Sequence, residues 1–193
     1  MNAVEAAFQP VLGLPCWGVQ CGYGSFLTLE FGQPHLEVVE PRPIPDGASE
    51  KTRRQLGRRL VTVHGDWHLW LYCCHWFVYA NGARAGDSST KKSVQEAVRV
   101  LAGQKLVAIK VNQLPGRSAF EFDLGARLVT RPYDDEARHG WLRDQWLLYE
   151  PSKMVLTFRS DGKYSHQSEN TLPADVEWHS FKAVVEDQSL GGG

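Results

Sequence analysis

The chain has 193 residues, of which 42% are hydrophobic and 22% charged, and its 21 Lys and Arg nearly balance its 22 Asp and Glu to give a net charge of −1. These values predict a folded protein with a packed core, and the balanced charge argues against binding to nucleic acid or to an anionic membrane. No stretch approaches the roughly 20 uncharged apolar residues of a membrane-spanning helix, and the first residues do not have the pattern of a secretory signal.

Strand patterns fill most of the first half of the chain. Four segments have a strand-like composition: residues 26–31, 36–39, 60–63 and a long aromatic run at 67–79. Asn81-Gly82, directly after the aromatic run, is a strong signal for a tight turn. Residues 49–56 fit a short helix that ends at Gly57, although few of its residues are apolar.

One helix pattern in the middle of the chain is well formed and predicts a helix over residues 88–102. Its apolar residues recur at helical spacing and make one stripe: Val94, Ala97, Val98 and Leu101. Asp87, Ser88 and Ser89 are N-cap candidates, and Gly103 stands where a C-terminal glycine belongs. Strand patterns then resume at residues 105–111, 119–124, 127–130, 146–149 and 154–159, followed by a turn at 160–162.

The chain also resembles itself. The stretch GSFLTLEFG at residues 24–32 recurs as RSAFEFDLG at residues 117–125. An aromatic strand follows in each half, at residues 69–72 and 146–149, and each half then reaches Asn81-Gly82 or Asp161-Gly162. Matched features in the same order are typical of a duplicated unit.

These patterns predict a mainly β (α+β) fold built from two similar antiparallel β-rich units, with one well-formed helix between them or packed against them. We expect the first unit at 12–86, the connecting helix at 87–103, the second unit at 104–166 and a C-terminal extension with a flexible tail at 167–193. The tail ends in Gly191-Gly192-Gly193, which we interpret as a flexible end or an expression remnant.

Three stretches carry a resemblance to other proteins: GSFLTLEFG, the Trp-Leu-Tyr strand at 70–72 and the segment RSDGKY at 159–164. Over about residues 12–166 they resemble uncharacterised bacterial proteins built from a small β-rich unit. That family offers no established catalytic residues. Some small bacterial proteins of this style act as immunity or regulatory partners, so the resemblance implies a protein that binds another protein.

His64, Asp66 and His68 are the sharpest candidates for chemistry. Residues two apart in a continuous strand project from the same face, so two imidazoles and a carboxylate would form an open site for a divalent metal. Gly65-Asp66 also has the composition of a hairpin turn, which would put the three side chains on separate strands. A metal-dependent enzyme at these residues is the alternative hypothesis for the function.

The four cysteines are Cys16, Cys21, Cys73 and Cys74. Cys73 and Cys74 are adjacent within the apolar aromatic run, where free thiols usually behave as small hydrophobes. Adjacent strand residues also point to opposite faces, which disfavours a shared zinc ion. We therefore expect structural, buried cysteines in a cytoplasmic protein.

Two groups of residues are candidates for binding a partner. The local basic patch Arg53, Arg54, Arg58 and Arg59 fits either a solvated helix face or a docking site for an acidic partner, because a nucleic-acid surface needs more positive charge with aromatic residues between the charges. Most of the seven tryptophans fit a β-rich core, and Trp141 and Trp178, in polar surroundings, are the ones expected at the surface.

The leading prediction for the function is a non-enzymatic protein–protein interaction module, in the concrete form of a bacterial immunity-like or regulatory partner. The sequence has no Gly-x-Ser-x-Gly elbow, no phosphate-binding loop and no His-Glu-x-x-His helix. We therefore expect a protein partner, no cofactor, no nucleic acid and no membrane.

Overall fold

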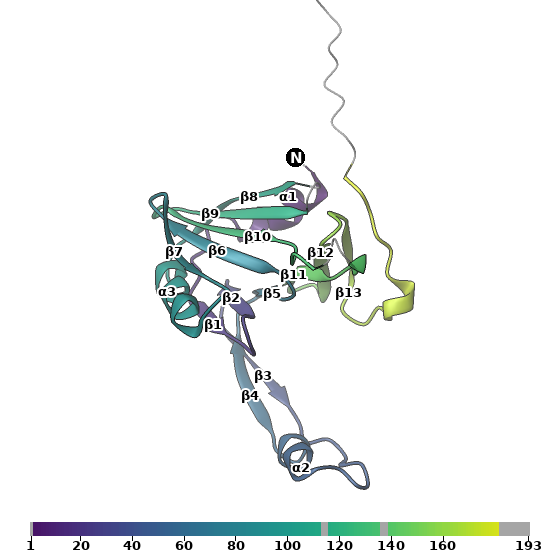
Figure 1. Ribbon diagram of the computed structural model, residues 1–193. Coiled ribbons are helices and arrows are strands. Elements are labelled where there is room, and N and C mark those ends of the chain that lie inside the picture. The colour runs from purple at the N-terminus through teal and green to yellow at the C-terminus, as the bar shows by residue number, and fades with distance from the viewer. Residues whose placement is uncertain (1, 113–115, 136–138, 182–193) are drawn as a thin grey trace, which may run out of the picture.

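The computed structural model describes residues 2–112, 116–135 and 139–181 (Figure 1). Within these ranges the helices are α1 (Ala3–Phe8), α2 (Glu50–Leu56) and α3 (Lys91–Leu101), with short 3-10 turns at η1 (Gln9–Val11) and η2 (Pro173–Asp175). The rest of the regular structure consists of antiparallel strands, so the predicted fold class, mainly β (α+β), is confirmed. No helix in the described part of the chain is long and apolar enough to cross a membrane.

A six-stranded sheet forms one layer of the molecule. Its strands, in spatial order, are β1 (Gly18–Cys21), β2 (Leu27–Phe31), β5 (Trp67–Leu71), β11 (Asp144–Tyr149), β12 (Met154–Arg159) and β13 (Tyr164–Ser168). The register places Leu29 beside Leu69 and Leu69 beside Leu148, and all three side chains are fully buried. One face of this sheet therefore belongs to the core.

A five-stranded sheet forms the second layer. Its strands, in spatial order, are β7 (Ala83–Asp87), β6 (His75–Ala80), β10 (Ala126–Arg131), β9 (Arg117–Phe122) and β8 (Leu106–Asn112). Phe8 of α1 joins the layers, because its ring lies 5.8 Å from Phe120 of this sheet and 5.7 Å from Trp146 of the other. The two sheets thus share one apolar core.

The strands β3 (His35–Val39) and β4 (Leu60–His64) form a separate two-stranded ribbon with α2 between them. We call residues 35–64 the arm. Figure 1 shows the arm projecting away from both sheets, with α2 at its far end. Among the described residues, the core takes none of its members from the arm.

Both predicted helices are present. α2 begins after Ser49, whose hydroxyl accepts the Thr52 N–H, and ends at Gly57 as expected. α3 begins later than predicted because Thr90, not one of residues 87–89, is its N-cap, and Gly103 follows its end with φ +83°. The aromatic run at 67–79 is divided between β5 and β6, which lie in different sheets. The sequence patterns missed α1, β1, β7 and β13.

The predicted units at 12–86 and 104–166 do not lie side by side as separate bodies, because each contributes strands to both sheets. β5 of the first unit pairs with β11 of the second, and β6 of the first pairs with β10 of the second. The helix α3 packs mainly on β7, with further contacts to β1 and β6. The tail at 182–193, including Gly191–Gly193, lies outside the described residues.

Candidate functional site

A cleft of about 1200 Å³ lies where the arm leaves the six-stranded sheet. Its sheet side is formed by outward-facing residues of β2, β5 and β11, including Thr28, Glu30, His68, Trp70 and Tyr149. Its arm side is formed by both ribbon strands, including Leu36, Val38, Val61, Val63 and His64. Polar and titratable groups collect at the inner end of this cleft, at the base of the arm.

Strand alternation places Glu30 on the outer face of the sheet. Its neighbours Leu29 and Phe31 are fully buried in the core, so the side chain between them must point the opposite way. The register sets Glu30 opposite His68 on one side and Gly18 on the other. A Cβ at Gly18 would lie 2.8 Å from the Glu30 Cγ, so the missing side chain leaves room for the glutamate.

His64 reaches the same place from the arm. It ends β4, and the next residue, Gly65, passes directly against β2. A Cβ at Gly65 would overlap the Phe31 carbonyl oxygen and stand 2.8 Å from the Phe31 nitrogen, so only glycine fits here. This close approach lets the Gly65 N–H donate to the Glu30 Oε2 at 2.9 Å.

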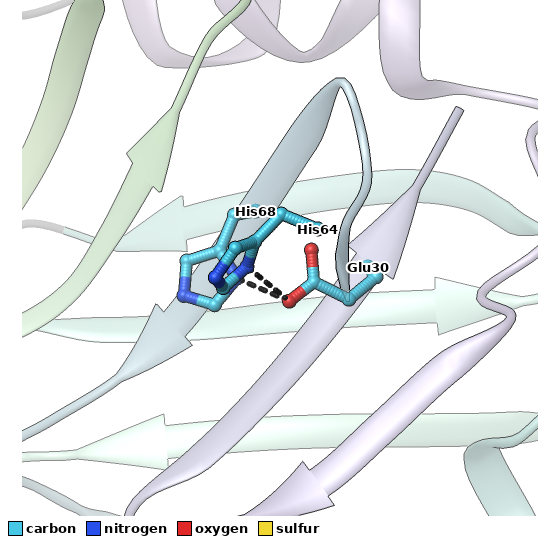
Figure 2. Close-up of side chains that lie close together, drawn as sticks. All are labelled: Glu30, His64 and His68. Atoms are coloured by element: carbon cyan, nitrogen blue, oxygen red, sulfur yellow. Dashed lines mark hydrogen bonds and ion pairs between the residues drawn. The ribbon is translucent and has the colours of Figure 1, made fainter. Parts of the chain in front are cut away.

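Glu30, His64 and His68 form a compact cluster (Figure 2). The Glu30 Oε1 lies 2.6 Å from the His68 Nδ1 and 3.1 Å from the His64 Nδ1, and the two imidazole rings meet edge to face at 5.1 Å. One donor atom from each residue lies within 4.8 Å of the other two. The cluster therefore gathers one carboxylate and two imidazole nitrogens around a single point.

The surroundings hold the Glu30 carboxylate in its charged form. Burial pushes its pKa up, but hydrogen bonds from His68, Gly65 and His64 and the charge of His68 outweigh burial, so the pKa lies below its ordinary value. The His64 Nε2 lies 3.2 Å from the Glu37 Oε2 on β3. Carboxylates and imidazoles thus alternate in a series of contacts from the arm to the sheet: Glu37, His64, Glu30 and His68.

The structure brings together two residues of the predicted metal triad and replaces the third. His64 and His68 do meet, but from two strands of different sheets, β4 and β5, and not from one face of a continuous strand. Asp66 is absent from the cluster, since its Oδ2 accepts the Gln33 N–H at 2.8 Å in the turn. Glu30 stands in its place, 34 residues before His64. The one feature of the sequence that points to Glu30 is its position as a carboxylate inside a strand pattern that is otherwise mostly apolar.

The predicted burial of the cysteines holds for two of them. Cys16 and Cys74 are buried, Cys73 is partly buried and Cys21 is exposed. The expectation was wrong for Cys21 because it ends the edge strand β1, which the aromatic run does not cover. Burial, with a smaller effect from the nearby Glu30 charge, raises the pKa of the Cys16 thiol to about 12.

The predicted binding residues lie in three different parts of the molecule. Arg53 and Arg54 belong to α2, and Arg58 and Arg59 follow it at the far end of the arm. Trp141, 51% exposed, precedes β11. Trp178 is only partly buried and lies against β12, because the Arg159 guanidinium covers its ring at 3.9 Å.

Trp141 belongs to a small polar assembly of its own. Its ring stacks on the His139 ring at 4.7 Å, and the Arg143 guanidinium lies 4.8 Å from it. Arg143 also pairs with Asp135 at 2.9 Å. The exposed tryptophan is therefore fixed in place by its neighbours.

Comparisons with protein-family models, with curated proteins and with solved structures found no match.

Proposed function

We propose that the protein is a non-enzymatic interaction module that binds another protein through the arm. The observation that carries the proposal is the apolar face of the ribbon, where Leu36 pairs with Val63 and Val38 with Val61. These four side chains are 47–66% exposed. An isolated two-stranded ribbon is marginally stable in water, and clustered exposed apolar side chains commonly mark a protein-binding surface.

The far end of the arm indicates the charge of the partner. Residues 40–59 contain six basic side chains and three acidic ones, whereas the whole chain carries a net charge of −1. The basic ones are Arg42, Lys51, Arg53, Arg54, Arg58 and Arg59. Two of the acidic ones pair with arginines, Glu50 with Arg54 and Glu40 with Arg59. The excess of positive charge favours a partner with an acidic surface beside an apolar strip.

The concrete form of this function is an immunity-like or regulatory partner of a bacterial protein. Binding of this kind needs no cofactor and no catalytic residue. We place the module in the cytoplasm, which suits the free thiols of Cys16 and Cys21.

The arm can be tested with a photo-crosslinking amino acid that replaces Leu36 or Val61. The protein that carries it is added to extract of the native host and irradiated. Leu124, 71% exposed in the β9–β10 turn, provides a matched control position. We expect one dominant crosslinked protein from the arm positions and none from Leu124. The same products from all three positions, or no product from the arm, would contradict the proposal.

The identified partner then allows the two parts of the arm to be separated. Val38→Ser with Val61→Ser should weaken its affinity at least about tenfold, because two exposed apolar contacts are lost. Arg53→Glu with Arg58→Glu should slow association and reduce its dependence on salt. Leu124→Ser should change neither quantity, and an equal loss in this control would argue for a general defect.

A metal-dependent enzyme is the second candidate function, and one observation favours it: His64 and His68 of the predicted triad do converge. The cleft beside them has room for a small substrate. This function requires a substrate whose turnover is lost on chelation and restored by the metal. Metal binding without any such turnover would leave the interaction module as the function.

A further inference from the structure

We infer that Glu30, His64 and His68 bind a divalent transition-metal ion of the Zn²⁺ class, and that this ion fastens the base of the arm to the six-stranded sheet. The inference is independent of what the arm binds. It rests on where the three donor atoms lie, on what holds them there, and on the charge that surrounds them.

The donor atoms are close to the spacing of a metal site. In a tetrahedral zinc site with bonds of about 2.0–2.1 Å, neighbouring donors stand roughly 3.3 Å apart. The Glu30 Oε1 lies 2.6 Å from the His68 Nδ1 and 3.1 Å from the His64 Nδ1. Small movements of the side chains would therefore change a hydrogen-bonded cluster into a ligated one.

Two of the three atoms that would not bind the ion already lie beside polar groups of the kind that support metal ligands. The Glu30 Oε2 accepts the Gly65 N–H at 2.9 Å, and the His64 Nε2 lies 3.2 Å from the Glu37 carboxylate. A histidine that binds zinc through one nitrogen usually donates its other N–H to a carboxylate, which fixes the ring. Glu37 lies at ion-pair distance from this nitrogen, and we expect it to take this role when the ion binds.

The charges around His64 also favour a cation. The His64 ring lies between two carboxylates, with Glu30 Oε1 3.1 Å from its Nδ1 and Glu37 Oε2 3.2 Å from its Nε2. The Glu30 side chain is 4% exposed, so its negative charge is costly unless it is matched nearby.

The ligand set leaves one position open. Two histidines and one glutamate are a known set for zinc ions that keep a fourth position for water or another ligand. The His64 and His68 side chains are 28% and 18% exposed and line the cleft. A fourth ligand would come from the cleft, whereas Glu30 closes the site on the sheet side.

The proposed ion would connect three strands, since Glu30 belongs to β2, His64 to β4 and His68 to β5. It would close the loop that contains the whole arm. We therefore expect Zn²⁺ to slow amide hydrogen exchange at residues 64–68 and at the first residues of β3, with little change in the five-stranded sheet.

The test uses the full chain, freed of metal with a chelator and titrated with Zn²⁺ in a calorimeter and with Co²⁺ in a visible spectrometer. We expect one equivalent to bind and Co²⁺ to give the intense bands of a four- or five-coordinate site. His64→Ala and His68→Ala should each weaken Zn²⁺ binding well over tenfold, and Glu37→Gln by about 10–100-fold.

Two control variants make the result specific. The Zn²⁺ affinity should be unchanged in Asp66→Asn, which alters the residue that the spacing suggested. It should also be unchanged in His75→Ala, which removes a partly exposed histidine beside Asp134. No binding by the wild type, or equal binding by the His64→Ala/His68→Ala double variant, would overturn the inference.

A second measurement covers variants that fold poorly. Excess Zn²⁺ should raise the melting temperature of the wild type and of Asp66→Asn, but not that of His68→Ala, because only binding to the folded state stabilises it. An equal rise in all three would overturn the inference. Crosslinking of the arm in metal-free protein tests the proposed function separately, so either result stands without the other.

Discussion

At the level of single residues, the site depends on two close approaches that glycines make possible. Gly18 leaves room for the Glu30 side chain, and Gly65 lets the arm return directly against Phe31. Without them the sheet and the arm could not bring Glu30 and His64 together. The glycines are therefore as much a part of the site as the titratable groups.

Gly65→Ala tests this dependence. The new Cβ would overlap the backbone of Phe31, which cannot move without disturbing β2, so we expect a loss of about 1–3 kcal/mol in the free energy of unfolding. Gly22→Ala is the control, because its nearest contact would be the Phe26 side chain at 3.3 Å. Urea unfolding measures both, and equal stability of the two variants would contradict the argument.

Cysteine reactivity provides a second prediction at this scale. Cys21 is exposed, whereas Cys16 is buried with its pKa raised to about 12, and the thiolate is the reactive form. At pH 8 we expect iodoacetamide to modify Cys21 first and Cys16 only after unfolding, as read by peptide mass spectrometry. Modification of Cys16 at the rate of Cys21 would contradict its burial in the core.

The candidate site was only partly predictable from the sequence. The spacing of His64 and His68 predicted a shared site on one face of a continuous strand, but the two residues meet from separate strands, β4 and β5. Asp66 was the wrong third residue because it serves the turn itself, accepting the Gln33 N–H. Glu30 lies on a strand that pairs with β5 only in the folded chain, and no local pattern reports that pairing.

At the level of elements, the parts with strong local signals were predicted well. Asn81 and Gly82 both have positive φ, as the expected hairpin turn requires, and Gly103 ends α3. The division of the aromatic run into β5 and β6 was not predictable, because residues 72–74 include neither glycine nor proline. What bends the chain there is the packing of its two halves into different sheets.

The junction between β7 and α3 gives a prediction of pH dependence. Burial raises the pKa of Asp87, but hydrogen bonds from Ser89 and Ser93 and the charge of Arg84, 2.6 Å away, outweigh it and lower the pKa overall. A lowered carboxyl pKa stabilises the fold above the unfolded-state pKa of about 3.9, and that stability is lost as the pH falls below it.

Asp87→Asn should therefore lower the free energy of unfolding by about 1–2 kcal/mol at pH 7, the range of a hydrogen bond to a charged group. The difference from the wild type should be smaller at pH 3, because below about 3.9 the unfolded chain binds a proton that the folded carboxylate resists. Urea titrations at the two pH values measure it. A difference that stays constant with pH would show that the charge of Asp87 is not what matters.

At the scale of the whole molecule, the two halves of the chain interlock in a symmetric way. One sheet begins β1-β2-β5-β11-β12, and the other, read in the same sense, is β8-β9-β10-β6-β7. The six-stranded sheet thus combines three strands of each half, because β13 adds a third strand of the second half, and the five-stranded sheet combines three strands of the second half with two of the first. We propose that this arrangement descends from a duplicated unit whose copies exchanged strands.

Two buried tryptophans support that proposal. The Trp76 Nε1 donates to the Ser25 carbonyl at 2.7 Å, and the Trp146 Nε1 donates to the Ser118 hydroxyl at 2.9 Å. Ser25 and Ser118 are matched positions of the repeated stretch. When the two strand orders are aligned, β11 matches β6 and β5 matches β10. The aromatic residues alone had suggested that β11 matches β5, but these two strands are neighbours in one sheet.

Interlocking predicts that neither half folds alone. Residues 1–103 and residues 104–193, expressed separately, would each leave unpaired strand edges and an open core, so we expect aggregation or broad, non-cooperative melting from each. Co-expression should recover a complex with strand content near that of the intact chain. Cooperative melting of residues 104–193 by themselves would contradict the interlocked arrangement.

The arm, in contrast, should be removable. Its residues contribute nothing to the described core, and Leu36 and Val63 are directly paired, so an Asn-Gly turn in place of residues 37–62 would close the ribbon between them. We expect one cooperative melting transition within roughly 2–4 °C of the wild type, which corresponds to about 1 kcal/mol in a chain of this size.

The shortened protein keeps Glu30, His64 and His68 but loses Glu37, Val38, Val61 and the basic end of the arm. It should therefore lose the partner that crosslinks to the arm and still bind Zn²⁺, about 10–100-fold more weakly because Glu37 is gone. Loss of the folded state would mean that the arm supports the sheets as well as extending from them.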